Sequence, residues 1–152
     1  MEYELGIPYE NLTIGQKASF SKTISETDIY LFAGISGDFN AMHLNEEYSK
    51  TTPFKTRIAH GFIPVSLCAP VVGMKLPGSG TIVIDHYVRY LRPTFIGDTI
   101  TATAEVIEKM PEKKRVKLRL TLVNQNGDAV SDGWVQVVPP KAQSTRLAQE
   151  NP

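Results

Sequence analysis

A chain of 152 residues is long enough for one domain with a substantial core but too short for two. Its sixteen basic and sixteen acidic residues balance, so the overall charge favours neither nucleic acid nor an anionic membrane as a partner. The single cysteine, Cys68, excludes an internal disulfide and a zinc site built from cysteines, and its apolar neighbours predict a buried structural thiol.

The N-terminal segment carries acidic residues rather than the basic region and apolar run of a signal peptide. No apolar run approaches the roughly 20 residues that a membrane-spanning helix needs. We therefore expect a cytoplasmic protein that does not associate with membranes.

The first part of the chain predicts one strand and one helix. Residues 1–15 are expected to form an extended arm, and apolar alternation over residues 17–24 predicts a short strand. Ser25 or Thr27 can cap the helix that follows, because a hydroxyl oxygen accepts a hydrogen bond from a free N–H of the first turn. Gly37 should end that helix, since glycine readily adopts the left-handed conformation found after a helix.

The segment after Gly37 should be irregular, and it holds a compact polar group between apolar residues. Asp38 and His43 are five positions apart, which on a continuous helix would separate them by about 140°. They can converge only if the helix has ended and the backbone turns, which Asp38 and Asn40 tolerate well. A short helix over residues 46–50, capped by the preceding asparagine, should follow.

Residues 61–72 predict a helix that is apolar on nearly every face and is therefore buried. Pro70 should kink this helix or end it early, because proline removes one helical hydrogen bond. The hydrophobic period then changes to two, which predicts strands over residues 81–92, 98–109, 115–124 and 129–138. Short connections, with Asn126-Gly127 as a hairpin signal, indicate mainly antiparallel neighbours.

These elements predict an α+β fold in which one antiparallel sheet wraps around the apolar helix. The domain should span residues 1–138, and the polar, proline-bounded tail over residues 139–152 should be mobile. The open strand edges of a five-stranded sheet make pairing with a second subunit reasonable.

Two short motifs resemble those of a known family. The chain is similar to the MaoC-like, R-specific enoyl-CoA hydratases in the run Gly37-Asp38-Phe39-Asn40-Ala41-Met42-His43 and in His60-Gly61 at the start of the apolar helix. The first motif departs from the family pattern at Ala41, where proline is usual. The resemblance continues through residues 76–82 and 91–98, and it covers about residues 12–138.

The resemblance implies a single hot-dog domain that adds water to a trans-2-enoyl-CoA, giving an (R)-3-hydroxyacyl-CoA, and that catalyses the reverse dehydration. It implies that Asp38 and His43 are the catalytic residues and hold one water between them. The Gly61 N–H would bind the thioester carbonyl, and Asn40 and His60 would support the site. A homodimer or a higher homo-oligomer is also implied.

The residue types agree with this chemistry independently of the resemblance. Hydration of a conjugated thioester needs water made nucleophilic at C3, a proton delivered to C2, and a donor to the charge that develops on the carbonyl oxygen. A carboxylate and an imidazole can act as general base and acid, and a backbone N–H can stabilise the oxyanion. No nucleophilic side chain, metal ion or redox cofactor is required, and coenzyme A enters only as part of the substrate.

The phosphates of coenzyme A call for positive charge, and the sequence offers several candidates without ranking them: Arg89, Arg92, Lys113, Lys114 and Arg115. The three consecutive basic residues also fit a solvated turn. His86, beside an aspartate on a strand, is expected at the surface or at an interface. Trp134, on an alternating strand, is expected in the core or at an interface.

Two other functions remain open at this stage. A hot-dog thioesterase would attack the thioester carbonyl, commonly with an acidic residue on the central helix, and residues 61–72 contain no Asp or Glu. A non-catalytic acyl-CoA-binding subunit could use the same fold. The presence of both Asp38 and His43 argues against such a subunit, whereas Ala41 and Ala69, where family members carry proline and in some cases serine, keep it open.

Overall fold

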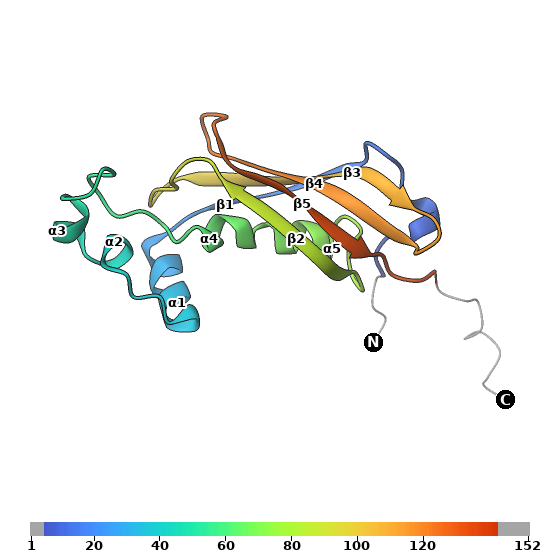
Figure 1. Cartoon of the computed structure of the whole chain (residues 1–152), viewed down its shortest axis with the longest axis horizontal. Helices are drawn as coiled ribbons and strands as arrows, with labels where there is room; N and C mark the ends of the chain where they lie inside the picture. Colours follow the sequence, from blue (N-terminus) through green and yellow to red (C-terminus); the bar gives the residue numbers. More distant parts are fainter. Residues whose placement is uncertain (1–4, 143–152) are drawn as a thin grey trace.

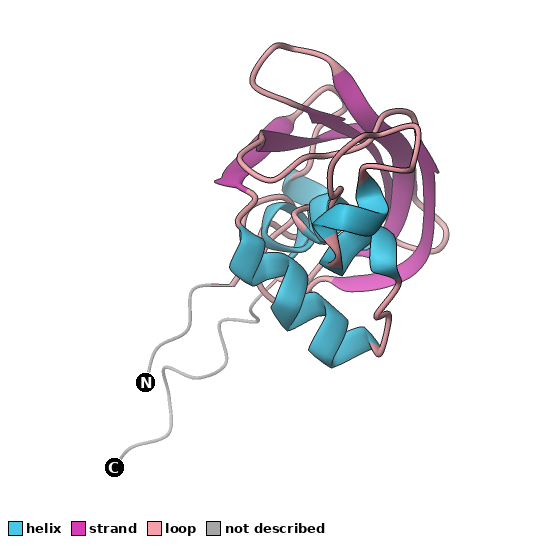
Figure 2. Ribbon diagram, turned by 90° about the vertical axis from the view of Figure 1, so that its left-hand side faces the viewer, coloured by secondary structure: helices cyan, strands magenta, loops and turns pink. Residues whose placement is uncertain are grey.

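A single curved sheet, with a helical segment on its concave side, makes up most of the fold (Figure 1, Figure 2). In the computed structural model, which describes residues 5–142, five strands form one antiparallel sheet in the order β1-β3-β4-β5-β2. The strands are β1 (Lys17–Thr23), β2 (Ile82–Tyr90), β3 (Thr99–Met110), β4 (Arg115–Val123) and β5 (Ala129–Val138). Their bounds lie within two residues of the predicted ranges, and the predicted α+β architecture is confirmed.

The order of the strands departs from simple succession at one place. β3, β4 and β5 are consecutive antiparallel neighbours, as the short connections indicate. β2 pairs with β5 instead of with β3, although only residues 91–98 separate β2 from β3 in sequence. Three strand positions amount to roughly 14 Å at about 4.8 Å per strand, a distance that eight residues span easily.

Alternation along the central strands places one row of side chains on the inner face. β3 contributes Ile100, Ala102, Ala104 and Val106, and β4 contributes Val116, Leu118, Leu120 and Leu122, all of them almost completely buried. The small alanines of β3 leave space for the helical segment that packs there. Burial of this row and of the helix stabilises the fold, at about 25 cal/mol per Å² of apolar surface removed from water.

The helix predicted over residues 61–72 is present as two segments, and it is buried on one side only, since Phe62, Ser66 and Ala69 are exposed. The two segments are α4 (Phe62–Ser66) and α5 (Cys68–Met74), with Leu67 between them. Pro70 has no N–H to donate to the carbonyl of Ser66 four residues earlier, which accounts for the interruption. Cys68 is buried, as expected, and burial raises the pKa of its thiol to about 12.

Three short helices lie beside the end of the sheet where α4 begins (Figure 1). α1 (Glu26–Ser36) starts at Ser25, whose hydroxyl accepts from the Asp28 N–H, and it ends at Gly37 in the left-handed conformation. α3 (Glu46–Ser49) is capped by Asn45, as predicted. The segment between them was expected to be irregular but contains one helical turn, α2 (Ala41–Leu44), because Asn40 caps it through the Met42 N–H.

The two ends of the described chain differ from the extended arm and the mobile tail that the sequence predicts. The described part of the predicted N-terminal arm contains a 3₁₀ turn, η1 (Tyr9–Asn11), rather than being extended throughout. Pro139 and Pro140, at the start of the predicted tail, are buried, while residues 1–4 and 143–152 lie outside the described residues. Within residues 5–142, no helix has the length and apolar character to cross a membrane.

Candidate active site

Asp38, His43 and His60 lie together where α1, α2 and α4 approach one another. One ring nitrogen of each histidine and one carboxylate oxygen of Asp38 all lie within 4.8 Å of one another. A single water that makes hydrogen bonds of about 2.8 Å to two such groups would bridge this spacing. Among the described residues, the same three side chains are also the set that could share a metal ion.

The backbone after α1 fixes the position of Asp38. Gly37, with φ of 76°, turns the chain away from the helix axis, and the Asp38 N–H donates to the Ser36 hydroxyl at 3.1 Å. The Asn40 N–H donates to the Asp38 carboxylate at 3.1 Å, while the Asn40 side chain caps α2. Asn40 therefore connects Asp38 to the helix that carries His43. The Asp38 side chain remains half exposed, so one carboxylate face is open to a ligand.

His43 is buried, and one of its ring nitrogens has a backbone partner. Its Nδ1 lies 2.8 Å from the carbonyl oxygen of Ile58. Because a carbonyl oxygen only accepts, Nδ1 carries the hydrogen and Nε2 keeps a free lone pair. Burial lowers the pKa of His43 below its ordinary value, and the nearby His60 lowers that pKa further. The hydrogen bond to the Ile58 carbonyl and the charge of Asp38 raise the pKa, but they do not cancel the decrease. His43 is therefore neutral near pH 7, with Nε2 able to accept a proton.

A set of ion pairs holds the segment that supplies the Ile58 carbonyl. Arg57 lies 2.6 Å from Glu26 of α1 and 3.2 Å from Glu46 of α3, and its side chain is largely shielded from solvent. The Tyr30 hydroxyl accepts a further hydrogen bond from the same guanidinium. Arg57 thus joins two helices to the strand-like segment directly before His60.

His60 supports Asp38 through the backbone. Its Nε2 donates to the Asp38 carbonyl oxygen at 2.9 Å, and its ring lies 3.9 Å from that of His43 and 5.0 Å from that of Phe32. The side chain is 2 % exposed, and within the described chain Nδ1 has no hydrogen-bond partner. The supporting position expected from the sequence thus corresponds to a specific contact with the neighbouring acid.

Gly61 follows His60 at the start of α4, and its N–H has no acceptor among the described residues. A Cβ at Gly61 would lie 2.7 Å from Cε1 of Tyr90, so the glycine allows the last residue of β2 to approach the backbone. The Phe62 ring then lies 6.4 Å from that of Tyr90 and 6.4 Å from that of Phe32. Gly61 thus lies beside a group of aromatic rings formed by Phe32, Phe62 and Tyr90.

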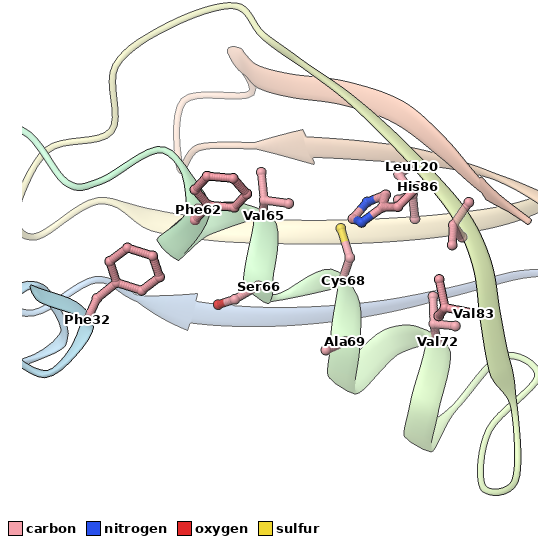
Figure 3. A pocket seen from close by; sticks show the side chains of 11 residues that line it. Phe32, Phe62, Val65, Ser66, Cys68, Ala69, Val72, Val83, His86 and Leu120 are labelled. Carbon is pink, nitrogen blue, oxygen red and sulfur yellow. The ribbon is translucent and has the colours of Figure 1, made fainter. Parts of the chain in front are cut away.

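Two cavities are lined by Gly61 or by the residue after it, Phe62. One, of about 360 Å³, is bordered by His43, Gly61, Tyr90 and Arg92. The other, of about 320 Å³, lies between the α4–α5 segment and the sheet and is almost entirely apolar (Figure 3). Its wall consists of Phe32, Phe62, Val65, Ser66, Cys68, Ala69, Val72, Val83, His86, Leu120 and Val135.

The structure separates the five basic candidates. Arg92 borders the cavity that contains His43 and Gly61, and it donates to the Ala129 carbonyl at 2.9 Å. Arg89 makes a two-point ion pair with Asp132 of β5, at 2.8 and 3.0 Å. Residues 113–115 lie at the β3–β4 turn, at the end of the sheet away from α1 and α2 (Figure 1), where Lys114 pairs with Glu10. Only Arg92 of these five is brought to the site.

A family model described as a MaoC like domain matches residues 10–126. The chain belongs to this family. It is 47% identical over 132 residues to an (R)-specific enoyl-CoA hydratase of Rhodospirillum rubrum, covering 87% of this chain and 91% of that protein. It is 38% identical to a 3-hydroxybutyryl-CoA dehydratase of Methylorubrum extorquens, covering 92% and 89%. The R-hydratase PhaJ1 of Pseudomonas aeruginosa superimposes with a TM-score of 0.86 and 41% identity, over 97% of this chain and 95% of that one.

These findings confirm the MaoC-like resemblance and the hot-dog fold of the domain. Sequence reasoning did not find the acceptor for His43, because a main-chain carbonyl at Ile58 has no signature in the sequence. His86 is exposed, as expected, but sequence reasoning did not show that it also lines the apolar cavity or that Tyr90 lies against Gly61. An inward-facing histidine and an inward-facing tyrosine on β2 would have been visible only once the strand register was known.

Proposed function

We propose that the protein catalyses the reversible addition of water to a trans-2-enoyl-CoA, giving an (R)-3-hydroxyacyl-CoA. The observation that carries this proposal is that the neutral His43, whose Nε2 keeps a free lone pair, has a ring nitrogen within 4.8 Å of a carboxylate oxygen of the half-exposed Asp38, a spacing that one water bridges. The names of the relatives, hydratases and a dehydratase of acyl-CoA substrates, support the same reaction and its R configuration.

In the hydration direction, His43 Nε2 accepts a proton from the water while the water oxygen forms its bond to C3 of the substrate. Asp38 accepts the second hydrogen bond of that water and so orients its lone pair toward C3. The electrons of the C2–C3 double bond move toward the thioester carbonyl. His43 then returns the proton to C2, so water is added across the double bond and the pair recovers its starting protonation state. Delivery of both parts from one water suits addition to a single face.

The Gly61 N–H supplies the remaining requirement. Charge that develops on the carbonyl oxygen during attack at C3 needs a donor, and such a donor is typically worth about 3 kcal/mol of the barrier. Gly61, whose N–H has no acceptor among the described residues, lines the cavity that contains His43, and the next residue, Phe62, lines the apolar cavity. A thioester bound there would direct its acyl chain along α4 and α5 into the apolar cavity and its coenzyme A toward Arg92. Arg92 is therefore our first candidate for the coenzyme A phosphates.

We also propose that the protein acts as a homodimer formed through β2. On its outer edge β2 has no partner strand among the described residues, and it exposes Ile82, Val83, Ile84, Tyr87 and Tyr90. An unpaired, apolar edge strand is a template for pairing with a second copy. Replacing Ile84 with Glu should yield a monomer in sedimentation analysis, whereas an unchanged dimer would place the interface elsewhere.

The first experiment is to follow the absorbance of the enoyl-thioester band with crotonyl-CoA and purified protein, alongside an assay for free thiol. Loss of the band without thiol release supports hydration, and chiral analysis of the product tests the R assignment. Thiol release would favour a thioesterase, although α4 and α5 carry no acidic side chain. Tight binding of medium-chain enoyl-CoA without turnover of any chain length would favour a non-catalytic binding subunit.

A further inference from the structure

His86 lies on the inner face of the sheet, where every neighbour across the strands is apolar. In the β2–β5 ladder it stands opposite Val135, a core residue, and Val135 in turn stands opposite Leu118 of β4. Asp85 pairs with Gln136 and so belongs to the opposite face. Figure 3 shows the imidazole projecting from β2 toward the α4–α5 segment, above Cys68. Neither the core nor the proposed reaction explains an imidazole at this point.

The apolar cavity offers this imidazole little to bond with. Of the other polar side chains in the wall, the Ser66 hydroxyl donates to the Ile63 carbonyl at 2.6 Å, and Cys68 carries a neutral thiol. The remaining wall residues, from α1, α4, α5, β2, β4 and β5, are apolar, and none is charged. His86 is exposed in the described chain, at the edge of the sheet that has no partner strand, and partial desolvation still lowers the pKa of its ring, which keeps it uncharged near pH 7. A neutral imidazole has one donor and one acceptor to offer to a ligand.

His86 lies at some distance from the reacting carbons. Tyr90, which contacts Gly61, and His86 belong to the same inward-facing row of β2, four residues apart, which corresponds to roughly 13 Å along the strand. The two ends of an acyl chain would therefore meet different surroundings. The thioester end would lie beside Gly61, and only the far part of a longer chain would reach the imidazole.

We propose that His86 is a specificity-determining residue that selects acyl chains bearing a hydroxyl or carbonyl oxygen far from the thioester over plain alkyl chains of the same length. This inference rests on the proposed function. A plain alkyl chain that fills the cavity displaces water from the imidazole and leaves its two nitrogens unpaired, which is unfavourable. An oxygen at the same depth replaces the lost water as a hydrogen-bond partner. Sites built to bond a polar group discriminate strongly against analogues that lack it.

The test compares three substrates: trans-2-butenoyl-CoA, trans-2-octenoyl-CoA and 8-hydroxy-trans-2-octenoyl-CoA. The measured quantity is the ratio of kcat/KM for the hydroxylated to the plain octenoyl substrate, with butenoyl-CoA as the reference for each protein. We expect this ratio to favour the hydroxylated chain by about tenfold or more in the wild type. In His86→Leu, which keeps the volume but loses both polar atoms, the preference should disappear or reverse.

Two further variants keep the test decisive. His86→Gln retains a donor and an acceptor, so it should retain part of the preference. Val83→Leu alters the same strand and the same cavity wall without removing a hydrogen bond, so it should leave the ratio within about twofold of the wild type. A wild-type ratio near one, or an equal ratio in the wild type and in His86→Leu, would overturn the proposal. Absence of turnover with all three substrates, butenoyl-CoA included, would overturn the proposed function itself and this inference with it.

Discussion

The two halves of the proposed substrate site are built in different ways. Asp38, His43 and His60 are each fixed by hydrogen bonds that involve the main chain, and both histidines are buried. The apolar cavity beside them has a wall whose β2 side is an exposed edge strand, and its residues Phe62, Ser66 and Ala69 are exposed as well. Polar groups that must hold one water need fixed positions, whereas an apolar wall needs only shape.

This difference predicts two kinds of response to substitution. Chemistry that depends on two or three fixed atoms should collapse when one of them is removed. Selectivity that is shared among many apolar contacts should change in a graded way, with the length and polarity of the acyl chain. Each of the following substitutions tests one half against the other.

The largest effect should follow from changes to Asp38 and His43, the pair proposed to hold the water. Asp38→Asn removes the charge and His43→Gln removes the proton acceptor, and each should lower kcat by at least about a hundredfold with crotonyl-CoA. Folding should be retained, because neither change removes a buried apolar contact, and thermal unfolding checks this. Asp128→Asn, at the exposed β4–β5 turn, is the matched control and should retain full activity. Near-normal turnover in either site variant would remove that residue from the mechanism.

A smaller loss should follow from Gly61→Ala, which tests the proposed oxyanion donor. The added methyl group would lie 2.7 Å from the Tyr90 ring, so the ring or the Gly61 backbone must move. We expect a loss of about tenfold in kcat/KM, since the N–H proposed to bind the thioester carbonyl would shift with the backbone. Gly61→Ala combined with Tyr90→Ala relieves the contact and should be more active than Gly61→Ala alone. A double variant as impaired as the single one would exclude this steric cause.

Filling the apolar cavity should affect chain-length preference more than catalysis. Ala69→Leu introduces a larger side chain into the wall at an exposed position, where folding should tolerate it. We expect kcat/KM for octenoyl-CoA to fall by about tenfold relative to that for crotonyl-CoA. Competition between the two substrates in one reaction measures this ratio directly. Equal losses for both chain lengths would show that the acyl chain takes another path.

Much of the fold could be predicted from the sequence, because its signals are local. The alternation over residues 115–124 and 129–138, Gly37 as a helix end and Pro70 as an interruption each depend on a few neighbouring residues. The position of β2 beside β5 was not predictable in this way. Strand order depends on which surfaces bury each other across the whole domain, and the short link of residues 91–98 suggested a closer neighbour.

The candidate site was predictable only in part, for a related reason. Asp38, His43, His60 and Gly61 were identified from motifs, and the structure brings them together at one end of the sheet. What the motifs could not supply are the partners that are common to every residue, such as the main-chain carbonyls of Ile58 and Asp38. These carbonyls determine which ring nitrogen of each histidine is free, and therefore which nitrogen of His43 can accept a proton in the proposed reaction.

The smallest expected effect concerns His60, which contacts both Asp38 and His43, the pair proposed to hold the water. Removing its ring removes an influence that lowers the pKa of His43, so the pKa of His43 should rise in His60→Gln. Since His43 must be neutral to accept a proton, the acid-side fall of kcat/KM should lie below pH 6.5 in the wild type and move to higher pH in the variant. Glutamine can still donate to the Asp38 carbonyl, so kcat at its optimum should fall by about tenfold or less. His60→Phe keeps an aromatic ring beside His43 and Phe32 but loses this donor, and it should lose more kcat than His60→Gln because Asp38 is then less well positioned. If the acid-side fall stays in place in both variants, the His60 ring does not tune His43 and serves only to hold the backbone.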